Sequence, residues 1–247
     1  MKSLLRQNIH NLTALWHAYG ADKSGSLCKN ISWPNRVWTN KVNGIIENLD
    51  LQNLKGVTEK NTFAVWSPKK DTSNSVYSTN IEFLSKTQNW RSESKLYCMS
   101  LALARWTLDK KDSNSLIRVA SSNQSQLTTF THVCSDGFGY RIDPNVILSV
   151  ARHPCVSIYL LYVNQQAVAT ALTYSSSEVF GLFQIAVPEQ QRGKGYAKQV
   201  TIELLNIAKQ QGYKIATLQA SLMGRSLYAK LGFREDGLLH LFKPSTI

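Results

Sequence analysis

Residues 187–200 read VPEQQRGKGYAKQV, with two glycines and two cations between positions 192 and 195. An apolar run precedes this stretch and a helix-like segment follows it. Glycine lets a ligand approach the main chain, and the first turn of a helix leaves backbone N–H groups unpaired at the positive end of its dipole. A phosphate group suits such a place. Residues 192–197 therefore predict an anion site, and the alternative is a tight turn that binds nothing.

Other phosphate-binding loops fit this stretch less well. A Walker loop requires Lys and then Ser or Thr after its last glycine, whereas Gly195 is followed by Tyr and Ala. A dinucleotide loop requires a third glycine where Lys198 stands, and it belongs to a βαβ unit. The charges of Arg192, Lys194 and Lys198 add to the predicted anion site, and Ala197 leaves the helix start unobstructed.

Composition indicates a globular chain of one or two domains. The 247 residues contain no apolar run long enough to cross a bilayer, and the first twenty lack the features of a secretory signal. We therefore expect a cytoplasmic protein with no membrane segment. Lys and Arg outnumber Asp and Glu by 28 to 16, which gives a formal net charge of +12. This excess is spread along the chain, so it favours a basic surface or an acidic ligand over a nucleic-acid interface.

The four cysteines are widely scattered and predict reduced thiols. They form no C-x-x-C pair and have no metal-ligand spacing to a histidine, so we expect no metal site. Two of them lie in apolar surroundings, where a cysteine is most often a packing residue. The four are Cys28, Cys98, Cys134 and Cys155.

The second half of the chain has clear periodicities. Three apolar runs, 156–163, 167–174 and 179–187, are joined by short polar turns and predict an antiparallel meander. From Gly195, apolar residues recur on one face of a helix that stops at Gly212. The remaining expected elements are a helix at 144–154 after a polar connection, a strand at 214–220, a helix at 221–231 stopped by Gly232, and a closing strand or hairpin.

The first half is less regular. It has helix-like segments at 4–19 and 41–54 and a strand at 64–66. A polar break at 110–115 predicts a boundary near residue 115, which separates domains 1–115 and 116–247. Residues 84–91 and 227–234 share Leu, an aromatic residue and Arg at the same spacing, which indicates either an old duplication or chance.

Residues 116–243 resemble the GNAT (Gcn5-related N-acetyltransferase) superfamily. Its signature, R/Q-x-x-G-x-G/A after an apolar strand, is met by RGKGYA at 192–197, and LQASLMGRSLYAKLGF at 218–233 is similar to its second hallmark. The resemblance implies an α/β (α+β) fold with a mixed, splayed central sheet. The first half has a weaker likeness to the degenerate GNAT-like region that precedes the catalytic domain in some members, but it lacks the signature.

The resemblance also implies an acetyl-CoA site. The pyrophosphate would bind the loop at 192–197, the pantetheine would run along 185–187, and the N–H of Ile185 would polarise the thioester carbonyl. Tyr228 matches the tyrosine that protonates the leaving thiolate, and the alternative is a tyrosine that packs beside Leu227. Ser221 either caps its helix or contacts the cofactor. The implied cofactor-binding residues are Ile185, Ala186, Val187, Arg192, Gly193, Lys194, Gly195, Tyr196, Ala197, Lys198 and Ser221.

No general base is assigned from the sequence. Some relatives carry a glutamate on the strand where Gly181 stands here, and glycine accepts no proton. Glu178, His153 and His132 are conceivable substitutes, and each is more typical of a surface or structural residue. The first half would cover the catalytic domain or shape the acceptor cleft, and residues 32–38 either line that cleft or belong to the core.

Together these implications predict an acetyl-CoA-dependent N-acetyltransferase in which a primary amine attacks the thioester directly in a ternary complex. The acceptor stays open between a small amine, an amino-acid derivative, an antibiotic and a protein N-terminus. The alternative is a CoA-binding regulatory module without turnover, which the missing base favours and Tyr228 opposes. Nucleic-acid binding through the positive charge ranks last, and the oligomeric state is not determined by the sequence.

Overall fold

The computed structural model describes residues 3–39, 54, 57–69, 81–82, 84–86, 89–108 and 115–245. The chain divides into two compact units. Unit 1 consists of residues 1–100 and 219–247, and unit 2 consists of residues 101–218. Most of the helix predicted at 41–54 and of the polar break at 110–115 lies outside the described residues, and the domain boundary near residue 115 stays a prediction.

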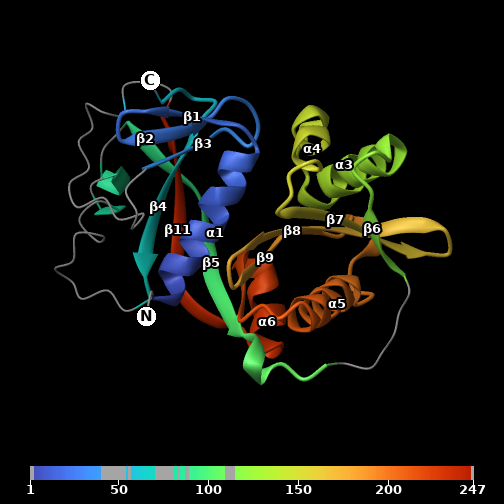
Figure 1. The fold of residues 1–247 in the computed structure, drawn as a ribbon. Coiled ribbons are helices and arrows are strands. Elements are labelled where there is room, and N and C mark those ends of the chain that lie inside the picture. Colours follow the sequence, from blue (N-terminus) through green and yellow to red (C-terminus); the bar gives the residue numbers. More distant parts are fainter. Residues whose placement is uncertain are drawn as a thin grey trace. The chain divides into compact units, whose positions relative to one another are not determined.

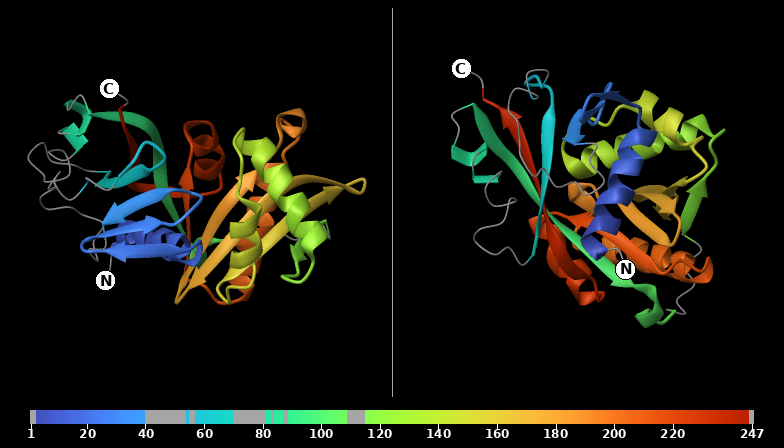
Figure 2. Two further views of the ribbon diagram at one scale, coloured as in Figure 1. Left: turned by 90° about the horizontal axis from the view of Figure 1, so that it is seen from above. Right: turned by 60° about the vertical axis from the view of Figure 1, so that its left-hand side comes forward.

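Unit 1 is built on a sheet in which the strand order is β1-β2-β3-β4-β11-β5. Its pairs are antiparallel except β3 with β4, and β11 lies between β4 and β5, as the right panel of Figure 2 shows. The closing strand predicted after residue 233 is therefore central in this sheet. The strands are β1 (Ala21–Ser24), β2 (Leu27–Asn30), β3 (Arg36–Thr39), β4 (Thr62–Pro68), β5 (Trp90–Ala102) and β11 (Arg234–Pro244).

Helix α1 (Leu4–Ala18) supplies much of the core of unit 1 and confirms the helix predicted at 4–19. It begins at Ser3, whose hydroxyl accepts a hydrogen bond from the N–H of Arg6. Its buried face includes Trp16, whose ring lies 5.2 Å from that of Trp38 and 5.8 Å from that of Trp66. Trp38 is thus a core residue and not a cleft residue.

Unit 2 contains the predicted antiparallel meander, in the strand order β10-β9-β8-β7-β6. Strands β6 to β9 pair antiparallel and β10 joins β9 in parallel, which confirms the mixed sheet. Helices α3 and α4 cover one face of this sheet and α5 covers the other (Figure 1). The strands are β6 (Leu116–Val119), β7 (Val156–Val163), β8 (Gln166–Ser176), β9 (Val179–Ala186) and β10 (Ile215–Ala220), and β10 ends in unit 1.

One helix of unit 2 corrects the sequence analysis. The expected polar connection before residue 144 contains α3 (Gln124–Phe138), which is capped by Asn123 and ends at Gly139 in a left-handed conformation. Its buried residues Leu127, Phe130 and Cys134 recur at helical spacing, but threonine and serine between them make the segment look polar. Further helical segments are η2 (Leu103–Arg105), α4 (Pro144–Val150), η3 (Glu189–Gln191), α5 (Tyr196–Gln210) and, in unit 1, α6 (Leu222–Lys230).

All four cysteines are free, as predicted. None of the helices in the described part of the chain has the length and apolar character of a membrane span. Within the described ranges, no three His, Cys, Asp or Glu side chains are grouped so that they could hold a metal ion.

Replacement of Gly237 by alanine tests the packing of β11. A Cβ atom at this position would lie 2.3 Å from the carbonyl oxygen of Ser67 and 3.0 Å from the methyl carbons of Leu5. We expect Gly237→Ala to lower the free energy of unfolding by roughly 2 to 4 kcal/mol, because backbone atoms cannot yield as a flexible side chain can. Urea denaturation measures this, with Ser94→Ala at an exposed position of β5 as the control. Equal stability of the two variants would contradict the register of β4 and β11.

Candidate functional site

The glycine-rich loop leads from β9 into α5 through two left-handed residues. Gly193 and Gly195 have φ angles of +77° and +84°, which side chains of L-residues disfavour. A Cβ atom at either position would meet nothing within 4 Å, so the glycines are required by backbone conformation and not by crowding within the protein. The tight-turn interpretation is therefore correct as a description of the loop, and it leaves the main chain open to a ligand.

Helix α5 begins without the usual side-chain cap. Gly195 is the N-cap residue and offers no side chain, and the first backbone hydrogen bond runs from the N–H of Gln199 to the carbonyl of Gly195. Among the described residues, none accepts a hydrogen bond from the amides of residues 196–198. These groups are at the positive end of a 15-residue helix with no acidic residue in its first turn. The helix start can therefore bind an anion.

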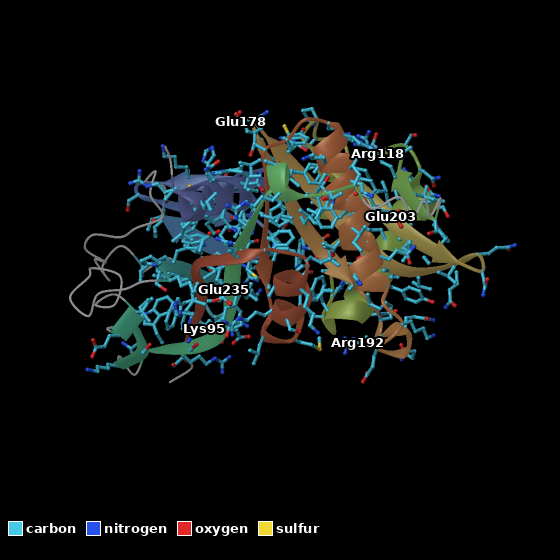
Figure 3. All side chains as sticks on the ribbon, turned by 90° about the horizontal axis from the view of Figure 1, so that it is seen from below. Lys95, Arg118, Glu178, Arg192, Glu203 and Glu235 are labelled. Carbon is cyan, nitrogen blue, oxygen red and sulfur yellow. The ribbon has the colours of Figure 1, made fainter. Side chains whose placement is uncertain are left out.

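The three predicted cations of the loop differ in what they contact. Lys194 and Lys198 are exposed, and the Lys194 ammonium donates to Oε1 of Gln191 at 2.9 Å. Arg192 instead directs its guanidinium to two main-chain carbonyls, those of Gly137 and Val187. Figure 3 shows Arg192 at the N-terminal end of α5, with Glu203 farther along this helix. Both lysine side chains are thus exposed and can attract an anion, whereas the guanidinium of Arg192 donates to two main-chain carbonyls.

Strand β9 has an open edge before the loop. It pairs with β10 only over residues 179–181, whereas its pairing with β8 continues to Ala186. Beyond Gly181, the main chain of β9 on the β10 side is left without a neighbouring strand in the described part of unit 2. Residues 185–187, predicted to lie along the pantetheine, are on this stretch. An extended ligand can add to such an edge as a strand does.

A bulge interrupts β9 just before Ile185. The pair Leu172 and Phe183 is followed by the pair Thr170 and Ala186, and Gln184 has a φ angle of +51°. The bulge is held from two sides, because the Thr170 hydroxyl donates to the Gln184 carbonyl at 2.8 Å and the Cys134 thiol lies 3.3 Å from Gln184 Oε1. Bulges redirect backbone groups near functional sites. The predicted amide donor of Ile185 directly follows this irregularity.

Tyr228 lies on α6 in unit 1 and packs against its neighbours. Its ring is edge-on to that of Phe233 at 5.9 Å, and Gly224 leaves room for it, since a Cβ atom there would be 3.2 Å from the tyrosine ring. No described residue forms a hydrogen bond with its hydroxyl. Burial raises the pKa of Tyr228 to about 12, so the phenol stays protonated in the physiological range.

Ser221 caps α6, which is one of the two roles predicted for it. Its hydroxyl accepts a hydrogen bond from the N–H of Gly224 at 3.2 Å. The next two residues, Leu222 and Met223, are 72% and 74% exposed although both are large and apolar. The start of α6 is therefore a surface feature of unit 1.

The three residues considered as substitute bases lie in different segments of unit 2. Glu178 is exposed in the turn before β9, at the opposite end of that strand from the glycine loop. His132 is exposed on α3, and His153 accepts a hydrogen bond from the N–H of Cys155 while its ring packs against Tyr174. None of the three is brought to the loop, so the base stays unassigned. Cys134 is no nucleophile, because burial raises the pKa of its thiol to about 12.

Two features of the loop were missed in the sequence analysis. Gly137 near the end of α3 contacts the end of β9 closely, and its signal was the glycine pair at 137 and 139 within a segment interpreted as polar. The bulge at Gln184 has no local sequence signal, because bulged and regular strands share the same composition.

Comparison with known proteins shows which family the region around this site is similar to. Residues 154–235 match the family described as the acetyltransferase (GNAT) domain, a stretch that contains β9, the glycine loop, α5 and α6. This match concerns residues 154–235 and not the rest of the chain. No curated protein matches the sequence.

Solved structures share the fold over a longer stretch. A GCN5-related N-acetyltransferase from Kribbella flavida has a TM-score of 0.65 at 12% identity, over 100% of this chain and 98% of that one. A protein from Novosphingobium aromaticivorans assigned to the GNAT family has a TM-score of 0.62 at 12% identity, over 97% and 96%. At this identity the likeness concerns the fold alone, and it extends beyond the GNAT domain into the first half.

The raised pKa of Tyr228 predicts a difference in stability at high pH. The phenol ionises near pH 10 in the unfolded protein and near pH 12 in the folded protein. Its contribution to the free energy of unfolding is therefore complete below pH 10 and is lost as the pH rises from 10 to 12. We expect the wild type to lose stability relative to Tyr228→Phe across this window. Urea denaturation at pH 9, 10 and 11 measures the difference. A constant difference would mean that the phenol is solvated.

Proposed function

We propose that the protein is an acetyl-CoA-dependent N-acetyltransferase. The match of residues 154–235 to the acetyltransferase (GNAT) domain supports an acyl-CoA-dependent transferase in general. The observation that carries the proposal for this chain is the start of α5, where unpaired amides, a glycine N-cap and exposed lysines lie together after an open strand edge. In the described part of the chain, no group accepts a hydrogen bond from these amides.

The loop would bind the pyrophosphate through its main chain. The amides of residues 196–198 are oriented by the helix, so they need little rearrangement to donate to phosphate oxygens. Lys194 and Lys198 would add attraction that weakens as salt is raised. Arg192 is left out of this set, because its Nε and Nη2 already donate to two main-chain carbonyls.

The open edge of β9 would bind the pantetheine and the acyl group. An amide of the ligand can pair with the main chain at residues 185–187, and the N–H of Ile185 would donate to the thioester oxygen as negative charge develops there. A hydrogen bond that strengthens with charge stabilises the transition state more than the bound substrate. The buried contacts of Gln184 fix this part of the backbone in advance.

Tyr228 would then donate a proton to the departing thiolate. A free thiol has a pKa near 8.5, so full transfer from a phenol of pKa about 12 would be uphill by about 5 kcal/mol. Surroundings that exclude water raise the pKa of a thiol as well, which brings the two pKa values closer together. The proposed role is a hydrogen bond to the thiolate that becomes proton transfer as the carbon–sulfur bond breaks.

The acceptor would be a primary amine that attacks in its uncharged form. Small molecules and a protein N-terminus both meet this chemical requirement. A CoA-binding module without turnover is distinguished by a single assay, in which a panel of amines is tested for the release of free thiol from acetyl-CoA. Release with none of the amines, together with tight binding of CoA, would favour that module.

Paired glycine variants test the anion site. Gly195 and Gly212 lie at opposite ends of α5, have φ angles of +84° and +80°, and would each direct a Cβ atom into open space. We expect alanine at either position to lower the free energy of unfolding by about 1 kcal/mol. Calorimetry should show weaker CoA binding for Gly195→Ala alone. Equal affinities of the two variants would place the pyrophosphate elsewhere.

Replacement of Tyr228 by phenylalanine tests the acid. We expect kcat to fall by roughly 100-fold, the low end of the range for general acid catalysis, with little change in the KM for acetyl-CoA. Tyr162→Phe, at a half-buried position of β7, is the matched control and should keep wild-type kcat. An unchanged kcat in Tyr228→Phe would leave the tyrosine a packing residue.

A further inference from the structure

The Arg192 guanidinium joins the glycine loop to the end of α3. Its Nη2 donates to the carbonyl of Gly137 at 2.9 Å, and its Nε donates to the carbonyl of Val187 at 3.3 Å. The first carbonyl belongs to the last turn of α3, where carbonyls lack helical partners and the dipole is negative. Since α3 has no basic residue in its own last turn, Arg192 supplies the cation from another segment.

Gly137 allows this contact because it has no side chain. A Cβ atom there would lie 2.8 Å from the Cβ of Ala186 and 2.9 Å from the backbone nitrogen of Val187. Both distances are below any that real Cβ atoms adopt, so the end of α3 rests directly on the main chain at the end of β9. That main chain is the stretch proposed to bind the pantetheine.

We propose that Arg192 and Gly137 form a clasp that holds the CoA-binding loop in its binding conformation, so that Arg192 is a positioning residue and not a phosphate ligand. This inference rests on the proposed function, because it assigns a role within the same site. Two elements far apart in the sequence, α3 and the loop, are fixed against each other at the point where β9 ends. The clasp therefore sets both the direction of the open edge and the start of α5.

The clasp acts by preorganisation. If the loop samples its binding conformation only part of the time, the apparent Kd for CoA rises by the inverse of that fraction. A charge contact with phosphate would instead weaken as salt is raised, whereas hydrogen bonds to neutral main-chain carbonyls respond little to salt. The two roles therefore differ in a measurable way.

Removal of the side chain gives the first test. We expect Arg192→Ala to raise the Kd for CoA by about tenfold, equally at low and high salt, since one net hydrogen bond corresponds to about that factor. The KM for acetyl-CoA should rise with kcat little changed. Arg118→Ala is the control, because it removes an exposed arginine on β6 (Figure 3) and should leave the Kd unchanged.

Two further variants separate the clasp from a charge effect. Arg192→Gln places its amide nitrogen where Nε stands, so it keeps a donor for the Val187 carbonyl and loses the charge. Arg192→Lys keeps the charge and loses the forked pair of donors. The clasp predicts intermediate Kd values for both. Wild-type affinity in the lysine variant with alanine-like affinity in the glutamine variant would overturn it and make Arg192 a phosphate ligand.

Gly137→Ala tests the other half of the clasp from the side of α3. It should raise the Kd for CoA and speed hydrogen exchange at the amides of residues 193–198, and Arg192→Ala should speed the same amides without lowering the melting temperature. Unchanged exchange and affinity in Arg192→Ala would overturn the inference even if Gly137→Ala fails to fold. Wild-type protein that does not bind CoA would instead defeat the proposed function.

Discussion

The site depends on main-chain amides that the fold leaves unpaired. A helix start is normally closed by the side chain of its N-cap residue, and Gly195 cannot provide one. Without a capping side chain, the helix lacks a stabilising hydrogen bond at its start. A ligand or solvent must then accept hydrogen bonds from these amides. Among the residues that the structure describes, none accepts a hydrogen bond from the amides of residues 196–198 in this first turn. The capacity to bind an anion is therefore a property of the backbone path, and the lysines only add to it.

The parts of the fold that could be predicted have local causes. Helix α5 shows its apolar face in the sequence and stops at a glycine, and the three strands of the meander are separated by polar turns. The glycine loop was identified for the same reason, because its residues are adjacent along the chain. Helix α3 had the same kind of signal at Leu127, Phe130 and Cys134, but serine and threonine hid it. Its outward hydroxyls bond to carbonyls within the helix, for example Thr128 to Gln124, which makes a polar segment compatible with a helix.

The parts that could not be predicted depend on partners distant in the sequence. A closing strand or hairpin is expected from the sequence of β11, but its place between β4 and β5 depends on which strands fit against it. In the observed register Gly237 lies opposite Pro68, and a Cβ atom at Gly237 would meet the carbonyl oxygen of Ser67. The role of Arg192 is of the same kind. Its position in the loop predicted a phosphate ligand, and the carbonyls that engage it come from α3, 55 residues away. The bulge at Gln184 likewise depends on Thr170 and Cys134.

The glycines of this chain have two different structural roles, and a sequence motif does not distinguish them. At Gly193, Gly195 and Gly212 the φ angle is positive and the space around a Cβ atom is empty, so a side chain would strain one residue and displace no neighbour. At Gly137 and Gly237 a side chain would push two elements apart. Both kinds of position carry glycine, so the sequence alone does not tell them apart. Of these five glycines, only Gly195 occupies a glycine position of the signature R/Q-x-x-G-x-G/A, since a signature records adjacency along the chain. Gly137 lies outside the signature, yet it determines how closely α3 approaches the strand edge on which the proposed substrate would lie.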